Sequence, residues 1–229
     1  MSLSMSDVHL SYTDGDGSAV RAVDGVSLEV PRGTTVVLTG PSGCGKSSVL
    51  AVAGTLIRPD SGRVEIGGIR VDGLSVEELA AVRREHVGLV FQHDNLVPGL
   101  TAEEQVLLAV HVGGRRPSRH RGQARELLAA VGLDGAFGRL PGQLSGGMRQ
   151  RVNIARALIM EPDVLLIDEP TSALDSRRGA EVMDLLREVT REREVASLLV
   201  THDLGTVGDA DTVLHMKDGA LVAEAAAVS

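Results

Sequence analysis

A glycine-rich segment is the part of this chain whose residues are best suited to binding phosphate. Residues 40–47 read GPSGCGKS, matching G-x-x-x-x-G-K-[S/T], and they lie between the β-branched run 34–39 and the helical stretch 48–53. Glycines let backbone amides curl around phosphate oxygens, while Lys46 supplies a positive charge and Ser47 offers a hydroxyl to Mg²⁺. The pattern predicts a nucleoside triphosphate site and is shared by kinases, GTPases, motor ATPases and transport ATPases.

Two adjacent carboxylates follow an apolar run, Val164–Ile167, that is typical of a buried strand. Ligands of open α/β sheets bind at the carboxyl edge of the strands. Beside a phosphate loop, we expect Asp168 to hold Mg²⁺ through water and Glu169 to take a proton from the water that attacks the γ-phosphate. The alternative is a solvated turn at a strand end, since Pro170 disfavours continuation into a helix.

A second glycine pair lies within residues 144–148, which read LSGGM and precede the helical pattern 149–160. Backbone amides at the positive end of a helix make an anion site. About one helix and one strand separate this segment from Asp168, so it need not face the phosphate loop of its own molecule. A head-to-tail dimer would bring the two together.

Alternating strands and helices must position these residues, and they indicate a mostly parallel α/β sheet. Hydroxyl–carboxylate pairs, Ser75 with Glu78 and Thr101 with Glu104, mark helix starts. The strand pattern is absent from about 93–143, which we interpret as a helical insertion in a single domain of residues 1–229. Strands are expected at 26–30, 34–39, 63–66, 87–91, 164–167, 197–200 and 212–215, and insertion helices at 101–112 and 119–131.

The charge balance and the low aromatic content of the chain limit the classes of function that it can have. The chain has 23 basic and 31 acidic residues, a net charge of −8, and three aromatic residues, which disfavours nucleic-acid binding. The basic connector 113–121 is a local exception, either a solvated loop or a contact with anionic lipid or an acidic partner. No apolar run approaches the ~20 residues that span a bilayer, and the first residues lack a secretion signal.

A single cysteine, Cys44, excludes an internal disulfide and fits a reducing, cytoplasmic setting. Within the phosphate loop this residue is either a small filler or a thiol made acidic by the helix end and Lys46.

Taken in order, the motifs resemble those of the nucleotide-binding subunit of ATP-binding cassette transporters. They are GPSGCGKS, Gln92 after VGLVF, LSGGM, VLLIDEP, SALD at 172–175 and His202 after SLLVT. FQHDNLVPGLTAEEQV and the chain length are similar to the stand-alone ATPases of the lipoprotein-release, macrolide-export and cell-division group. Met148, Ser48 and Gln105 depart from the residues usual in that family.

The resemblance implies a P-loop NTPase core with an N-terminal antiparallel β subdomain and an inserted α-helical subdomain. It also implies a homodimer that sandwiches two ATP molecules and drives an integral membrane permease at the inner face of the cell membrane. The alternative is a regulatory ATPase coupled to a membrane protein, as in cell division. Neither form implies nucleic acid or a membrane span of its own.

The same resemblance assigns roles to individual residues. Gln92 would touch the metal or the lytic water, and His202 would contact the γ-phosphate and position the base. Tyr12 could instead be an ordinary strand aromatic, His202 a cap before Asp203, and Gln92 a polar strand end. The expected nucleotide-binding residues are Tyr12 on adenine, then Gly40, Pro41, Ser42, Gly43, Cys44, Gly45, Lys46, Ser47 and Ser48, then Ser145, Gly146 and Gly147 across the dimer, and Asp175 in a loop that communicates between sites.

Overall fold

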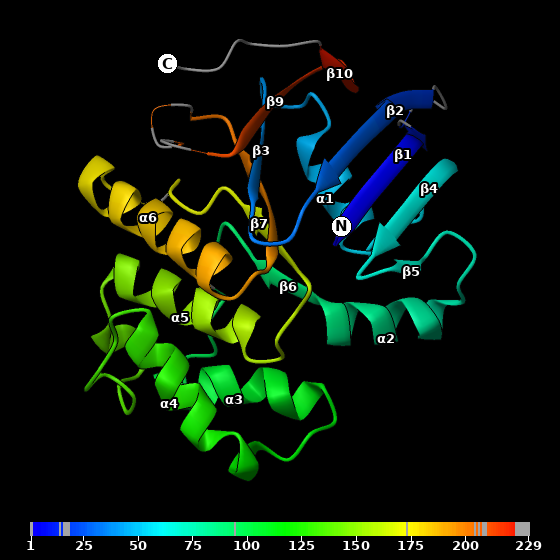
Figure 1. The fold of residues 1–229 in the computed structure, drawn as a ribbon. Coiled ribbons are helices and arrows are strands. Elements are labelled where there is room, and N and C mark those ends of the chain that lie inside the picture. The colour runs from blue at the N-terminus through cyan, green and yellow to red at the C-terminus, as the bar shows by residue number, and fades with distance from the viewer. Residues whose placement is uncertain are drawn as a thin grey trace.

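The computed structural model describes residues 2–13, 15, 19–93, 95–172, 174–203, 205, 207 and 210–222. Residue 94 of the FQHDN segment and residue 173 of the SALD segment lie outside these ranges. The described chain forms two sheets and six α-helices, with the helices α3, α4 and α5 gathered below the larger sheet in the view of Figure 1.

The larger sheet has six strands in the order β10-β9-β3-β8-β7-β6. Strands β9, β3, β8, β7 and β6 run parallel, and β10 is antiparallel to β9. Every residue of β3 and β8 is buried, as expected where helices or a second layer cover both faces of a parallel sheet. The strand bounds are β3 Thr35–Thr39, β6 Val87–Val90, β7 Val164–Asp168, β8 Ala196–Thr201, β9 Thr212–Lys217 and β10 Ala220–Val222.

The smaller sheet is antiparallel, in the order β2-β1-β4-β5, which confirms the predicted N-terminal β subdomain. Its strands are β1 Leu3–Thr13, β2 Ala19–Val30, β4 Ser61–Ile66 and β5 Ile69–Arg70. We did not predict β1 from the sequence. Its alternation is broken at Asp7, where φ is 49° and the pairing register with β2 shifts between Met5 and Val8, as at a β-bulge.

Helix α1 (Lys46–Ala53) contacts the strands of both sheets, and α2 (Val76–His86) packs on β6. Both predicted capping boxes are present: the Ser75 hydroxyl accepts from the Glu78 amide, and the Thr101 hydroxyl accepts from the Glu104 amide. The other helices are α3 Ala102–Val112, α4 Arg121–Ala130, α5 Gly146–Leu158 and α6 Ser176–Glu192.

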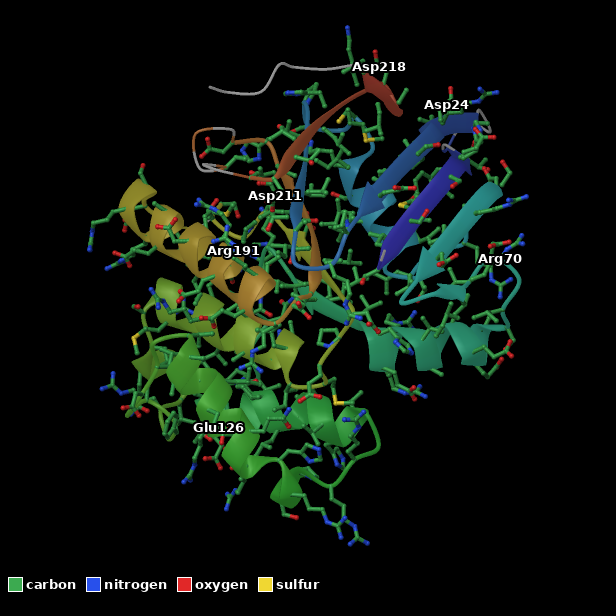
Figure 2. All side chains as sticks on the ribbon, viewed as in Figure 1. Asp24, Arg70, Glu126, Arg191, Asp211 and Asp218 are labelled. Carbon is green, nitrogen blue, oxygen red and sulfur yellow. The ribbon has the colours of Figure 1, made fainter. Side chains whose placement is uncertain are left out.

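The predicted helical insertion contains α3 and α4, and α5 packs against both, so the three helices share an apolar core. That core continues onto α6 and one side of the large sheet, while α1, α2 and the small sheet form a second core. Charged residues such as Glu126 on α4 and Arg191 on α6, both labelled in Figure 2, are exposed.

The basic connector is more ordered than a plain loop. Pro117–Arg119 form a 3-10 turn, and α4 begins at Arg121 rather than at residue 119. The side chain of Arg121 pairs with Glu103 at 2.9 Å, and Arg125 pairs with the other oxygen of the same carboxylate. Glu103 is only 5% exposed, so these arginines compensate a buried charge.

Among the described residues, no helix has the length and apolar character needed to cross a bilayer.

Candidate nucleotide site

The residues expected to do chemistry lie at one edge of the large sheet. Strands β3, β6, β7 and β8 are parallel, so their carboxyl ends meet at that edge. The phosphate loop follows β3, Gln92 follows β6, Glu169 follows β7 and His202 follows β8. The topology therefore brings together motifs that lie as far apart in the chain as Gly40 and His202.

The phosphate loop is shaped by close backbone contacts at two glycines. At Gly40 (φ 152°) an added Cβ would lie 2.1 Å from the Met216 carbonyl oxygen, and at Gly45 (φ 106°) it would lie 1.9 Å from the Ala22 carbonyl oxygen. Positive φ and such approaches are open only to glycine. These contacts seat the loop between β2 and β9.

Lys46 is the first residue of α1 and is only 7% exposed. Its ammonium donates to the carbonyl oxygens of Gly40 at 2.8 Å and Pro41 at 2.9 Å. These bonds hold the cation inside the curve of the loop, beside the free amides of the helix start. Lys46 and the loop together form a cradle for phosphate oxygens.

Cys44 is a filler of this loop. It is 6% exposed, belongs to the apolar core around α1, and its sulfur lies 3.8 Å from the Lys46 ammonium. A buried thiol is shielded from maleimides even without nucleotide, so labelling of Cys44 is not a useful measure of loop occupancy. Burial of the sulfur favours the filler over the reactive thiol that the sequence left open.

Glu169 and His202 are joined directly. The Nδ1 atom of His202 lies 2.7 Å from Oε1 of Glu169, and the Glu169 amide donates to the Val200 carbonyl at 2.9 Å. Glu169 adopts φ 45°, a strained value for a non-glycine residue that is typical of functional turns. The cap before Asp203 comes from the Thr201 hydroxyl, not from His202. The histidine therefore orients a carboxylate.

Asp168 ends β7 beside this pair. Burial and then the charge of Glu169 raise the pKa of the Asp168 carboxyl, and the nearby Lys46 ammonium opposes the rise. The positive charge of Lys46 does not fully offset the effects of burial and of Glu169 on this carboxylate, so a bound cation would stabilise its charged form. Carboxylate oxygens are also ligands that Mg²⁺ prefers. The electrostatics of the residues present thus fit a metal at this position.

This pKa shift leads to a stability prediction. The folded state binds the Asp168 proton more tightly than the unfolded state, so stability falls as pH rises from the ordinary aspartate pKa through the raised one. Asp168→Asn removes this pH-dependent loss of folding stability, because asparagine does not ionise. In the absence of nucleotide and metal, we expect Asp168→Asn to raise the melting temperature at pH 7, with the difference from the unsubstituted protein disappearing towards acid pH.

Differential scanning fluorimetry across a pH series measures this effect. Asp163→Asn is the matched control, because Asp163 is ion-paired with Arg32 and contacts the His86 imidazole at the opposite edge of the sheet, so its loss should lower the melting temperature. A melting temperature for Asp168→Asn at or below that of the unsubstituted protein at pH 7 would contradict the argument.

Gln92 and Gly146 line one hollow of about 280 Å³. The other lining residues are His93, Arg149, Gln150, Pro170 and Leu174. Gln92 is exposed at the rim. Among the described residues, Gln150 Nε2 and Arg187 Nε are the buried side-chain atoms without a hydrogen-bond partner. The hollow joins the start of α5 to the loop that carries Gln92.

The segment LSGGM begins a helix, with one correction to its predicted bounds. Helix α5 starts at Gly146 rather than at residue 149, because the Ser145 hydroxyl accepts from the Met148 amide as an N-cap. Gly146 and Gly147 therefore form the first turn, where unpaired amides carry the positive end of the helix dipole. This is the second anion site that the sequence predicts.

Two further predicted residues have structural contacts. The Tyr12 side chain is 42% exposed at the end of β1, with its hydroxyl 3.4 Å from that of Ser48 on α1. Asp175 caps α6 by accepting from the Arg178 amide at 3.0 Å, and that bond lowers the pKa of Asp175. Stacking of Tyr12 on adenine and communication through Asp175 stay predictions.

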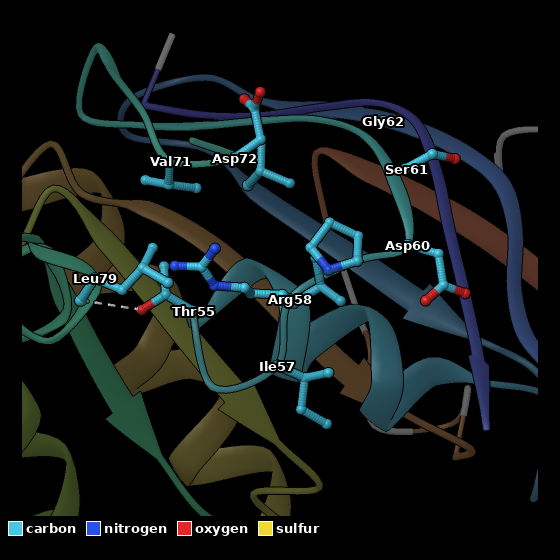
Figure 3. Close-up of a pocket in the computed structure, with 12 residues that line it drawn as sticks. Thr55, Ile57, Arg58, Asp60, Ser61, Gly62, Val71, Asp72 and Leu79 are labelled. Carbon is cyan, nitrogen blue, oxygen red and sulfur yellow. Dashed lines mark hydrogen bonds between the residues drawn. The ribbon is translucent and has the colours of Figure 1, made fainter. Parts of the chain in front are cut away.

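A separate hollow of about 220 Å³ lies away from this edge, between the end of α1, β4, the residues after β5, and α2 (Figure 3). Buried apolar side chains, among them Val71 and Leu79, line it. The Thr55 hydroxyl donates to the Leu79 carbonyl at its wall. None of the phosphate-loop residues takes part, so the hollow is not assigned to the nucleotide.

Residues 23–172 match the family model described as "ABC transporter". The match covers more than half of the chain and includes both glycine-rich segments and the carboxylate pair. The chain belongs to the ABC transporter family. It is an ATPase cassette of that family, and the fold class expected from the sequence is confirmed.

Curated relatives share the sequence over almost the whole chain. The chain is 41% identical over 213 residues to the macrolide export ATP-binding/permease protein MacB of Rhodopseudomonas palustris (strain HaA2). It is 42% identical over 216 residues to an uncharacterized ABC transporter ATP-binding protein of Mycobacterium tuberculosis (strain ATCC 25618 / H37Rv). The alignments cover 93% of this chain but only 32% and 64% of those relatives.

Solved cassettes have the same fold. The dimeric post-hydrolysis structure of the ATP-binding cassette MJ0796, bound to ADP and Pi, superposes with a TM-score of 0.84 at 37% identity and 96% coverage of both chains. The cbiO1 structure from Clostridium perfringens, part of the ABC transporter complex cbiONQ, also gives 0.84, at 28% identity, with 96% of this chain and 86% of that one covered.

Proposed function

We propose that this cassette hydrolyses ATP with Mg²⁺ in a homodimer and uses the cycle to change the conformation of an integral membrane permease. The observation that carries the proposal is the contact between Glu169 and His202, placed beside Asp168 at the edge where the phosphate loop also opens. A carboxylate oriented by a histidine next to a phosphate cradle is arranged to activate water.

Different residues of the proposed site hold the phosphates, hold the metal and accept the proton. Lys46 and the loop amides hold the phosphates, and Ser47, Asp168 and Gln92 would hold Mg²⁺, which neutralises charge that develops on the transferred phosphoryl group. Glu169 accepts a proton from the attacking water. His202 holds Glu169 in place through the contact at 2.7 Å and presents its imidazole to the γ-phosphate side.

The position of the second anion site, at the start of α5, is the reason for proposing a dimer. Ser145, Gly146 and Gly147 lie at the start of α5. This helix belongs with α3 and α4 to one packed set, the helical group, whereas the phosphate loop lies between the two sheets. We propose that the α5 start of one protomer closes on the γ-phosphate held by the loop of the other. The dimeric state of the MJ0796 cassette supports this arrangement.

A complementation experiment tests the shared site. Lys46→Ala damages the phosphate loop, and Gly146→Asp places a negative charge where the γ-phosphate would bind. Each variant alone should hydrolyse ATP at background rates, because both of its sites contain the defect. A mixture should recover activity, since mixed dimers contain one intact composite site.

Phosphate release from titrated mixtures measures this recovery. The matched control is a mixture of the Lys46→Ala variant with a double variant that carries both Lys46→Ala and Gly146→Asp. It should stay inactive, because every phosphate loop in it lacks the lysine. If the first mixture also stays at background while size-exclusion chromatography shows mixed dimers, the site is not shared between protomers.

The proposed partner of this cassette is an integral membrane permease. The R. palustris relative is named an ATP-binding/permease protein, and this chain covers 32% of its length, which supports coupling to a permease at the inner face of the membrane. We favour export, or mechanotransmission of the macrolide and lipoprotein kind, over a purely regulatory ATPase. Crosslinking in membranes, followed by identification of the captured integral protein, distinguishes these partners.

A further inference from the structure

The structure assigns to Asn153, a residue of α5, the task of positioning Gln92. The inference rests on the proposed function, in which Gln92 contacts Mg²⁺ or the attacking water. Asn153 would not touch the nucleotide, so it is a positioning residue and not a catalytic one. No feature of the sequence singled it out.

Asn153 contacts the backbone next to Gln92. Its side chain has no exposed surface, and its Nδ2 atom donates to the Phe91 carbonyl oxygen at 3.2 Å. Strand β6 ends at Val90, so Phe91 is the residue between the strand and Gln92. Asn153 therefore holds the peptide group that immediately precedes Gln92.

Arg156 orients the side-chain amide of Asn153. One turn further along α5, Arg156 donates from Nη2 to the Asn153 Oδ1 atom at 2.8 Å. Arg156 also donates from Nη1 to the Asn95 carbonyl oxygen at 3.3 Å. The arginine fixes which way the Asn153 amide faces and anchors the loop on the far side of Gln92 and His93.

The Asn153 contact differs in position from the contacts that Gln105 makes with the same loop. Gln105 on α3 also holds the loop, but further on, through Val97 and Leu100. Both anchors belong to the helical group, yet only the Asn153 contact lies next to Gln92. A buried amide in the middle of a helix is unfavourable unless its donor and acceptor are both used, and here both are.

The consequence is a rigid link between two parts of the site. Helix α5 starts with Gly146 and Gly147 and carries Asn153 about two turns later, roughly 10 Å along the axis. When the start of α5 moves to meet a γ-phosphate, the Phe91 peptide must move with it. Asn153 thereby links the position of Gln92 to closure of the α5 start of the same protomer.

The experiment is a double-mutant cycle in steady-state ATP hydrolysis with Asn153→Ala, Gln92→Ala and the pair. We expect Asn153→Ala to lower kcat roughly tenfold, the equivalent of one lost buried hydrogen bond in the transition state. KM for ATP should stay within about twofold, because binding by the phosphate loop is untouched. Alanine is favourable in a helix, so α5 should form.

The cycle separates the inference from the proposed function. In the Gln92→Ala background, Asn153→Ala should have no further effect on kcat, since the group that it positions is gone. Full additivity of the two substitutions overturns the inference. A normal kcat for Gln92→Ala alone instead overturns the role proposed for Gln92.

A second variant and a spectroscopic readout exclude a general packing effect. Asn153→Asp keeps the size and the acceptor for Arg156 but cannot donate to Phe91, so it should match Asn153→Ala; a kcat equal to that of the unsubstituted protein overturns the inference. The chain has no tryptophan. In His93→Trp, the single indole should become more accessible to acrylamide when Asn153→Ala is added.

The matched control is Thr190→Val, which removes a buried hydrogen bond to Ser197 at 2.6 Å near the opposite edge of the sheet. It should leave indole quenching unchanged, and its effect on kcat should be the same with and without Gln92. Equal quenching of the indole in the presence and absence of Asn153→Ala counts against the proposed link.

Discussion

Replacing Glu169 with glutamine should slow ATP turnover by roughly 10² to 10⁴, the span usual for the loss of a general base. Glutamine has the size of glutamate and still offers an oxygen to the His202 imidazole, which lies 2.7 Å from the carboxylate in the structure. The geometry of the site should persist while the proton acceptor disappears. ATP binding should be retained, and the ATP-bound dimer should last longer.

Stopped-flow phosphate release and size-exclusion chromatography with ATP measure the two effects. Glu161→Gln is the matched control, because Glu161 also adopts a left-handed backbone (φ 56°) but lies outside the site, where it accepts from Gln123. Turnover in the control should be normal. Near-normal phosphate release in Glu169→Gln would show that another group accepts the proton.

Replacing Lys46 with alanine should weaken ATP binding by roughly 10- to 150-fold, which corresponds to the loss of a hydrogen bond to a charged group. The ammonium is the buried positive charge of the loop, and it also bonds the Gly40 and Pro41 carbonyls. Its removal leaves those oxygens without that donor and the phosphates without their counter-charge. Isothermal titration calorimetry with ATP measures the change.

Lys217→Ala serves as the control for a simple loss of net charge. Lys217 is the chain's other lysine and is exposed at the end of β9. Its replacement should leave ATP affinity nearly unchanged. Equal losses in the two variants would mean that general electrostatic attraction, and not the cradle, determines the affinity.

The sequence predicted the parts of this molecule that are encoded locally. Runs of β-branched residues predicted the central strands, and the hydroxyl–carboxylate pairs at Ser75 and Thr101 predicted two helix starts that the structure confirms. The parallel order of the strands then placed the motif residues at one edge. This part of the site could be assembled from spacing because the phosphate loop, Gln92, Glu169 and His202 each follow the end of a strand.

The sequence did not predict features that depend on long-range contacts. Strand β1 was missed because the irregularity at Asp7 disrupts its alternation, and α6 was missed altogether. The bond from Asn153 to the Phe91 carbonyl joins residues 62 positions apart. Nothing local distinguishes such an asparagine from a polar residue on a solvated helix face.

The seating of the phosphate loop has a consequence for turnover. Because Gly40 and Gly45 rest against the Met216 and Ala22 carbonyls, contacts within the chain itself support the curved form of the loop. A loop that the chain itself holds in shape should lose little conformational entropy when it binds phosphate. We therefore expect changes in the affinity for ATP during the cycle to come from the parts that move relative to the loop, such as the start of α5 of the other protomer. The phosphate loop itself would keep the same form throughout.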